Sequence, residues 1–333
     1  MLWHWEMNTK IVYVLVSREN DIYTEQAYVS MFSVKYHMPD AHITLIIDSI
    51  TKESLSKRRV DILQYVDELI TVPITGKYTP MQISRVLKTT VRFHVLGDFL
   101  FLDSDIIVTD TLYEIDSFQF NIGAVLDLHV DLFQNYLLKD VVIHRLHKYF
   151  GYNKDVNQYF NSGVLYVKEC EEANQFYNLW HEKWKEGCSK GLNVDQPALV
   201  IANDLMSSLI AELDGIYNCQ IRYTIRYLYD AKIIHYFTAR IEDFSPLFTL
   251  NFYMTIKNKG NISFEDTQLI INCKRSFSVM SMVNTGIAAE ISDVSNSRFI
   301  NSAVFIRKKS KTAYLLLVLF VRAYKKLIQI LFR

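Results

Sequence analysis

The chain has 333 residues, half of them hydrophobic, and its 36 basic residues balance its 36 acidic residues. This length allows one large domain, or one domain with a smaller appendage, and the composition excludes a wholly disordered protein. The four cysteines form no C-x-x-C pair, so neither a disulfide framework nor a zinc site is indicated, and free thiols in a reducing compartment are expected.

The N-terminal third alternates between strand and helix patterns. The predicted elements, in chain order, are a strand at 11–17, a helix at 21–36, a strand at 41–48, a helix at 52–65, a strand at 68–74, a helix at 80–96 and a strand at 99–108. Such an alternation predicts an α/β fold with right-handed crossovers and a mostly parallel, doubly wound sheet. Ligands of such sheets bind at the carboxyl ends of the strands.

The rest of the chain is less regular. We predict strands at 121–128, 162–168 and 231–237 and helices at 171–186 and 195–210. After Pro246 the pattern becomes helical and rich in loops. We therefore assign residues 1–245 to the main domain and 246–333 to a helical C-terminal extension.

Residues 99–108 read FLFLDSDIIV, a strand of apolar residues that carries Asp103 and Asp105 with only Ser104 between them. Side chains two positions apart in a strand point the same way, so the two carboxylates should lie together. A divalent cation between them and an anionic ligand would remove their repulsion, and oxygen ligands suit Mg²⁺ or Mn²⁺. The alternative is a pair of solvated carboxylates just beyond the strand end.

Other nucleotide-binding and hydrolytic patterns are missing. A dinucleotide-binding fold needs a glycine-rich turn after its first strand, where this chain reads SREND. The sequence also has no Walker A motif and no G-x-S-x-G motif.

Four segments, in this order, resemble the family 8 glycosyltransferases, which include glycogenin and the lipopolysaccharide galactosyltransferases. They are FLDSDIIV, YFNSGVLYVK (159–168), NVDQPAL (193–199) and IIHYF (233–237), and the resemblance covers about residues 10–245. It implies a GT-A fold with a mixed, mostly parallel central sheet. It also implies transfer of a sugar from a UDP-sugar with retention of anomeric configuration, helped by Mn²⁺ or Mg²⁺.

The resemblance implies a set of site residues. The metal ligands would be Asp103, Asp105 and His235. Donor-binding residues would be Val16, Ser17, Tyr23, Arg85, Lys88, Asp103, Ser104, Asn161, Ser162 and Arg240. The catalytic candidates are Asp195 and Gln196, which would sit by the anomeric carbon, and Asp127, from AVLDLH, which we add as a candidate contact to the sugar or the acceptor. Retention would need either a covalent intermediate, on Asp195 or Asp127, or front-face attack by the acceptor hydroxyl, which we favour.

Each of these assignments has a structural alternative. His235 fits a hydrogen-bonded core histidine as well as a ligand. Asp195 stands before Gln-Pro at a predicted helix start, which is an ordinary N-cap setting. Arg85 and Lys88 lie on the polar face of an amphipathic helix, where solvated side chains are usual.

The C-terminal segment is basic. From Val294 to Arg333 there are nine Lys and Arg residues and no Asp or Glu. The apolar run at 313–321 is shorter than the roughly 20 residues of a transmembrane helix. We expect residues from about 307 to 333 to form a basic amphipathic helix on an anionic membrane surface; packing on the main domain is the alternative. No nucleic-acid-binding motif accompanies the charge, so no nucleic-acid partner is expected.

These observations lead to one expected function. The chain would move a hexose from a UDP-sugar to a glycan or lipid-linked glycan acceptor in lipopolysaccharide, capsular or other surface polysaccharide synthesis. The N-terminal segment MLWHWEMNTK does not resemble a secretion signal, so we expect a cytoplasmic protein that is peripheral on the inner face of the cell membrane. The alternative is a catalytically silent relative that binds sugar nucleotides or glycans as a membrane-docked partner.

Overall fold

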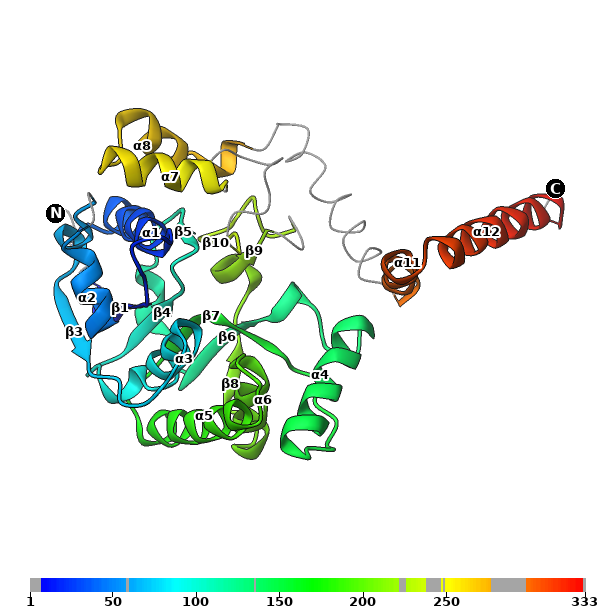
Figure 1. The fold of residues 1–333 in the computed structure, drawn as a ribbon, viewed down its shortest axis with the longest axis horizontal. Helices are drawn as coiled ribbons and strands as arrows, with labels where there is room; N and C mark the ends of the chain where they lie inside the picture. The colour runs from blue at the N-terminus through cyan, green and yellow to red at the C-terminus, as the bar shows by residue number, and fades with distance from the viewer. Residues whose placement is uncertain are drawn as a thin grey trace.

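A computed structural model of the chain describes residues 7–57, 60–134, 136–221, 226–237, 247, 249–276 and 298–331. A seven-stranded sheet forms the centre of the fold (Figure 1). Its strands, in spatial order, are β3 (Glu68–Val72), β2 (Ile43–Asp48), β1 (Lys10–Leu15), β4 (Phe99–Leu102), β7 (Phe160–Val167), β6 (Ile122–Leu126) and β8 (Ile210–Glu212). A three-stranded sheet contains β5 (Ile106–Val108), β10 (Ile233–His235) and β9 (Cys219–Gln220), in that order.

The large sheet is mixed but mostly parallel, as the sequence predicted. Strands β3, β2, β1 and β4 pair in parallel, β7 runs antiparallel to both β4 and β6, and β8 pairs in parallel with β6. Successive side chains of β1 point to opposite faces of the sheet and pack into two different hydrophobic cores. Ile11, Tyr13 and Leu15 lie in one, and Val12 and Val14 lie in the other. A strand buried on both faces reads as the continuous apolar run seen in the sequence.

Helices cover both faces of the large sheet (Figure 1). The helices of the main body are α1 (Tyr23–His37), α2 (Ser49–Leu55), α3 (Pro80–Thr89), α4 (Tyr136–Phe150), α5 (Glu171–Ser189) and α6 (Gln196–Leu205). Those that follow are α7 (Leu250–Lys259), α8 (Phe264–Ile271), α11 (Arg298–Lys309) and α12 (Lys311–Leu331). Short 3₁₀ turns span Ile62–Tyr65, Val91–Phe93, Tyr113–Ser117, Asp127–His129, Gly215–Asn218 and Cys273–Ser276.

The C-terminal helices differ in how they meet the body. Helices α7 and α8 place Phe252, Tyr253, Ile256 and Ile270 in the same core as α1. Helix α11 contacts α4, and α12 projects away from the rest of the chain (Figure 1). The division of the chain at residues 245 and 246 stays a prediction.

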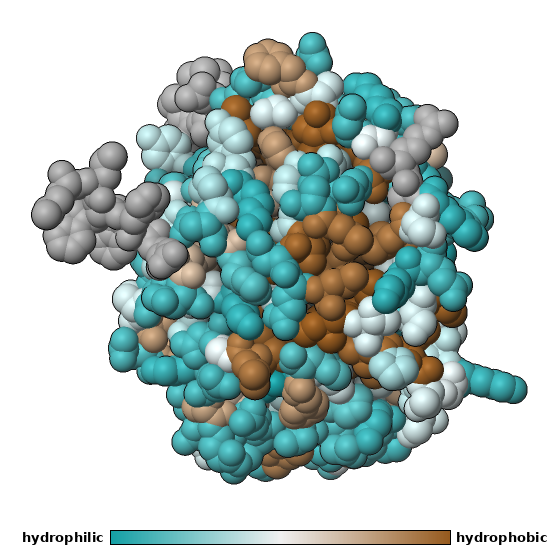
Figure 2. All heavy atoms as spheres, turned by 90° about the vertical axis from the view of Figure 1, so that its left-hand side faces the viewer, coloured by the Kyte–Doolittle hydropathy of each residue, from teal (hydrophilic) through white to brown (hydrophobic). Residues whose placement is uncertain are grey.

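One face of the molecule carries apolar side chains between polar ones (Figure 2). It is the face at the left of Figure 1, where the edge strand β3 and helix α2 lie. Exposed apolar side chains of this region include Ile50, Leu63 and Leu69.

The segment predicted as one strand, 99–108, is two strands in two different sheets. The Asp103 N–H donates to the carbonyl of Gly163, which follows the pairing of β4 with β7. The Asp105 carbonyl instead accepts from the N–H of Tyr236, beside the pairing of β5 with β10. The chain therefore passes from the large sheet to the small one at Ser104.

Two predicted helices are shorter than expected. The helix predicted at 80–96 ends at Thr89, where the Thr89 and Thr90 hydroxyls donate to the carbonyls of Arg85 and Val86, each at 2.8 Å. Threonine side chains that bond to carbonyls of the preceding turn compete with helix continuation. The helix predicted at 52–65 is α2 followed by a separate 3₁₀ turn.

The helix predicted at 195–210 ends at Leu205 and is followed by strand β8, which was not predicted. Ser207 and Ser208 adopt left-handed backbone angles, with φ of 57° and 60°. The Asn203 side chain then accepts the N–H of Ile210 at 2.8 Å. These local bonds turn the chain back toward the sheet.

Candidate active site

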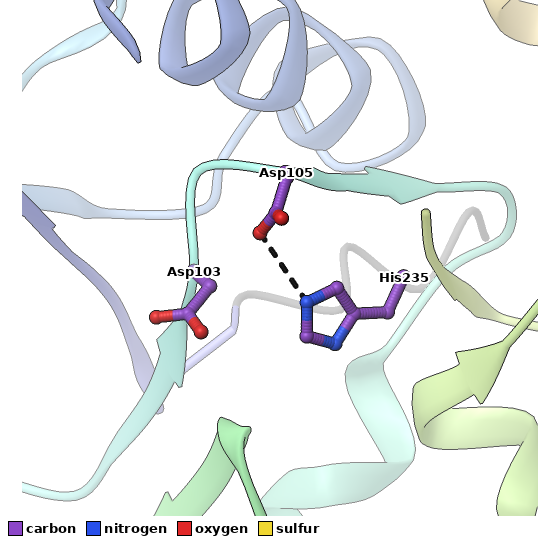
Figure 3. A group of neighbouring side chains, drawn as sticks. All are labelled: Asp103, Asp105 and His235. Atoms are coloured by element: carbon purple, nitrogen blue, oxygen red, sulfur yellow. Dashed lines mark ion pairs between the residues drawn. The ribbon is translucent and has the colours of Figure 1, made fainter. Parts of the chain in front are cut away.

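The two aspartates and the histidine converge where the two sheets meet (Figure 3). Asp103 follows β4, Asp105 precedes β5, and His235 ends β10. One ligand atom from each of the three residues lies within 4.8 Å of the other two. The Nε2 atom of His235 is 3.3 Å from Oδ1 of Asp105. The break at Ser104 and the pairing of β5 with β10 create this convergence.

The His235 ring is held on several sides. It is 2% exposed, its Nδ1 lies 3.1 Å from the Asn218 side-chain oxygen, and it stacks on Phe237 with ring centroids 3.9 Å apart. Gly163 leaves the space that the ring fills. A Cβ atom at this glycine would lie 2.4 Å from Cε1 of His235 and 2.9 Å from Oδ2 of Asp103.

These residues fit a divalent cation. The two carboxylates suit Mn²⁺ or Mg²⁺, and the imidazole nitrogen offers a third ligand atom. A histidine ligand usually has its second ring nitrogen hydrogen-bonded, as His235 does. His235 is therefore a hydrogen-bonded core histidine, which was the structural alternative to a metal ligand. Its Nε2 also faces the aspartates, so the two roles are compatible.

A cavity of about 320 Å³ opens beside this cluster, at the carboxyl ends of β1 and β4. Among its lining residues, six were predicted: Val16, Tyr23, Arg85, Asp103, Ser104 and Asp105. Five were not: Leu15, Asp21, Pro80, Met81 and Ser84. Asp21 follows the first strand in the turn SREND, which also contains Glu19, so the sequence alone did not single it out.

A second group of charges lies behind the cavity and joins Asp103 to Asp195. The Lys88 ammonium is 3.0 Å from Oδ1 of Asp103 and 3.9 Å from Oδ2 of Asp195, and Lys88 is only 3% exposed. Arg85 Nε lies 3.0 Å from Oδ1 of Asp195, an ion pair by distance without directed hydrogen-bond geometry. Lys88 is therefore not a solvated side chain, and Arg85 faces both Asp195 and the cavity.

Asp195 is a buried carboxylate with its partners in place. It is 3% exposed, and the Ser162 hydroxyl donates to its Oδ2 at 2.8 Å. Burial acts to raise the pKa of Asp195, but Arg85, Lys88 and Ser162 outweigh burial and leave that pKa below its usual value. The side chain makes no capping hydrogen bond to α6, so N-capping does not account for it.

Asp127 lies in a third group, after β6. The Asn161 amide donates to its Oδ1 at 2.8 Å, and Gln196 hydrogen-bonds to the same carboxylate. Burial raises the pKa of Asp127, against the opposing effect of these two hydrogen bonds. The predicted sugar-side residues Asp127, Asn161 and Gln196 are thus brought together.

Among the described donor-binding candidates, Ser17, Lys88, Asn161 and Ser162 do not line the cavity. Ser17 is fully buried, donates to Asp21 at 2.5 Å and accepts from Thr24 at 2.8 Å, so it holds the turn instead of facing the cavity. Arg240 lies outside the described residues.

The carboxylates, the histidine and the cavity lie at the strand ends of a mixed α/β sheet, which is where such sheets bind their ligands. The model of the nucleotide-diphospho-sugar transferase family matches residues 40–266, and the chain belongs to this family. The resemblance to the family 8 glycosyltransferases is confirmed. A search of curated proteins finds no match.

Several solved glycosyltransferases are similar to this chain at low sequence identity. The galactosyltransferase LgtC, in complex with donor and acceptor sugar analogs, is 13% identical over 77% of this chain and 98% of its own, with a TM-score of 0.51. Mouse xyloside xylosyltransferase 1, in its apo form, is 14% identical over 68% and 97%, with a TM-score of 0.44. GlyE from Streptococcus pneumoniae TIGR4 is 19% identical over 79% and 63%, with a TM-score of 0.47. The likeness to LgtC supports the GT-A-like fold.

Proposed function

We propose that this glycosyltransferase is metal-dependent and moves a hexose from a UDP-sugar to a glycan acceptor with retention of configuration. The pathway we propose is lipopolysaccharide, capsular or other surface polysaccharide synthesis. The observation that supports the proposal most is the convergence of Asp103, Asp105 and His235 beside the cavity.

Asp103, Asp105 and Nε2 of His235 would hold Mn²⁺ or Mg²⁺ against the donor diphosphate. When bound, the cation supplies Lewis-acid stabilisation of the charge that develops on the departing UDP. Arg85 faces the same cavity and adds a fixed positive charge. Lys88 is anchored between Asp103 and Asp195, so it orients both carboxylates.

The partners of Asp195 argue against a covalent intermediate on this residue. One of its oxygens faces Arg85, and the other faces Ser162 and Lys88. A carboxylate held in this way is a fixed anion that can stabilise an oxocarbenium-like centre, and it is not free to attack. We therefore favour front-face attack by the acceptor hydroxyl, with Asp127 and Gln196 contacting the sugar or the acceptor.

Helix α12 has an exposed apolar side that could hold the protein at a membrane, where a lipid-linked acceptor would also lie. Leu316, Leu319 and Phe320 lie on one side of the helix and are 64%, 58% and 69% exposed. Among the described helices, none has the length and apolar content to cross a bilayer. We propose that α12 lies on an anionic membrane surface, and that the protein is peripheral on the cytoplasmic side. The side chains of Lys325, Lys326 and Gln329, and all of Arg333, lie outside the described residues.

The experiment incubates the protein with a panel of UDP-sugars and Mn²⁺ and measures UDP release, with and without EDTA. We expect slow release with one sugar, which EDTA, Asp103→Asn and Asp105→Asn each abolish. Asp110→Asn is the matched control, since Asp110 is an exposed aspartate just after β5. UDP-sugar binding without turnover, even with acceptors present, would instead identify a catalytically silent partner. Release that is unaffected by EDTA would refute metal dependence.

A further inference from the structure

Within the part of the chain that the structure describes, Nδ1 of His235 has its hydrogen-bond partner in Asn218, a residue that the sequence did not indicate. It ends the 3₁₀ turn Gly215–Asn218 and is fully buried. Its side-chain oxygen lies 3.1 Å from Nδ1, while Nε2 on the other side of the ring faces Asp105 at 3.3 Å. The ring is therefore placed between an amide and the carboxylates.

The direction of each hydrogen bond around Asn218 follows from its neighbours. The Gly163 backbone N–H can only donate, and it lies 2.9 Å from the Asn161 side-chain oxygen. That oxygen is thus an acceptor, and it also accepts from the Asn218 amide nitrogen at 3.0 Å. The Asn218 oxygen then faces His235, and an amide oxygen can only accept. The proton of this hydrogen bond must therefore sit on Nδ1.

A proton on Nδ1 has a consequence for the other ring nitrogen. A neutral imidazole carries one proton, so with Nδ1 protonated the lone pair lies on Nε2. That lone pair is directed at the aspartates, which is the arrangement a cation ligand needs. We propose that Asn218 is the positioning residue of the metal site, fixing the tautomer and the orientation of His235. This inference rests on the metal dependence proposed above.

Residues 218–220 also support the turn that carries Asp127, the candidate contact to the sugar or the acceptor. Gln220, two residues after Asn218, accepts the N–H of Leu128 and donates to the carbonyl of Leu126, both at 2.8 Å. Leu128 and His129 have left-handed φ angles of 59° and 57°, a strained turn that needs such support. Residues 218–220 thus hold His235 with one side chain and the turn that carries Asp127 with another.

The test measures Mn²⁺ affinity in the presence of UDP, by electron paramagnetic resonance of free Mn²⁺, in the full chain. Asn218→Leu removes the acceptor, and we expect Mn²⁺ binding about 10- to 100-fold weaker. Asn218→Asp keeps an acceptor for Nδ1, and we expect it to restore affinity to within about 3-fold of the wild type. Asn203→Leu is the matched control, a buried asparagine outside the site, and its Mn²⁺ affinity should equal that of the wild type.

The outcomes separate this inference from the proposed function. No Mn²⁺ binding by the wild type refutes metal dependence itself. Wild-type binding that Asn218→Leu leaves unchanged, or that Asn203→Leu weakens equally, overturns the role of Asn218. If Asn218→Leu does not fold, nitrogen NMR of the imidazole rings in the Mg²⁺-loaded wild type shows which nitrogen of His235 carries the proton. The His235 signal is assigned by its absence in His235→Gln. A proton on Nδ1 of His235 supports the inference, and a proton on Nε2 overturns it.

Discussion

Gly163→Ala is a change that adds one methyl group next to the metal ligands and alters no charge. The new Cβ would lie 2.4 Å from Cε1 of His235, whereas ordinary contact begins at 3.4 Å. It would also lie 2.9 Å from Oδ2 of Asp103 and from the Asn161 side-chain oxygen. The ring must therefore move by about 1 Å, on the scale at which misplaced catalytic groups lose about 100-fold in rate.

We expect this displacement to weaken Mn²⁺ binding about 10- to 100-fold, which corresponds to about 1.4–2.7 kcal/mol. Overpacking should also lower the free energy of unfolding by about 1–3 kcal/mol. Mn²⁺ titration in the presence of UDP measures the first effect, and urea unfolding measures the second.

Gly187→Ala is the matched control, because its Cβ would lie 2.7 Å from Cζ of Phe150, outside the site. It should lose unfolding free energy and keep its Mn²⁺ affinity. Wild-type Mn²⁺ affinity in a folded Gly163→Ala protein would show that His235 and Asp103 do not hold the cation. Equal loss of Mn²⁺ affinity in both variants would show a general packing effect.

Three further predictions concern acid stability, membrane binding and helix capping. The depressed pKa of Asp195 in the folded protein stabilises the fold above the unfolded pKa, and this stabilisation is lost as pH falls through the folded pKa. Arg85→Met should raise the pKa of Asp195 and move acid unfolding, followed by circular dichroism, to higher pH; an unchanged midpoint would contradict the ion pair. Deleting residues 311–333 should reduce co-sedimentation with anionic vesicles and leave UDP release in solution unchanged, and equal vesicle binding by the shortened chain would rule out α12 as the docking element. Thr79 forms a reciprocal capping box with Gln82 at the start of α3, so Thr79→Ala should lower the free energy of unfolding by about 1 kcal/mol in urea, and wild-type stability would mean that the cap is redundant.

The sheet could be predicted from local pattern because its strands are buried on both faces. Val12 and Tyr13 are both fully buried, and the apolar run they belong to is visible without any tertiary information. Helix α4 also had a usable signal that was missed, since Leu138, Val142 and Leu146 recur every four residues and pack together. Strands β8 and β9 span only 210–212 and 219–220, too short for a periodic signal.

Most charged residues of the candidate site could be named from the sequence, with Asp21 an exception, but their geometry could not. The break at Ser104 leaves no local mark, because the apolar residues continue on both sides of it and the change of sheet depends on pairing with β7 and β10. Asn218 was missed for the same reason. Its partner His235 is 17 residues away and reaches it only through the pairing of β9 with β10.

A crystal structure of the full chain with UDP and Mn²⁺, with anomalous data at the manganese edge, tests the central claim most directly. We predict one anomalous peak bonded to Asp103, Asp105 and Nε2 of His235 and touching the diphosphate. UDP in the cavity with no manganese on these three residues, or with the His235 ring turned away from both aspartates, would contradict the claim.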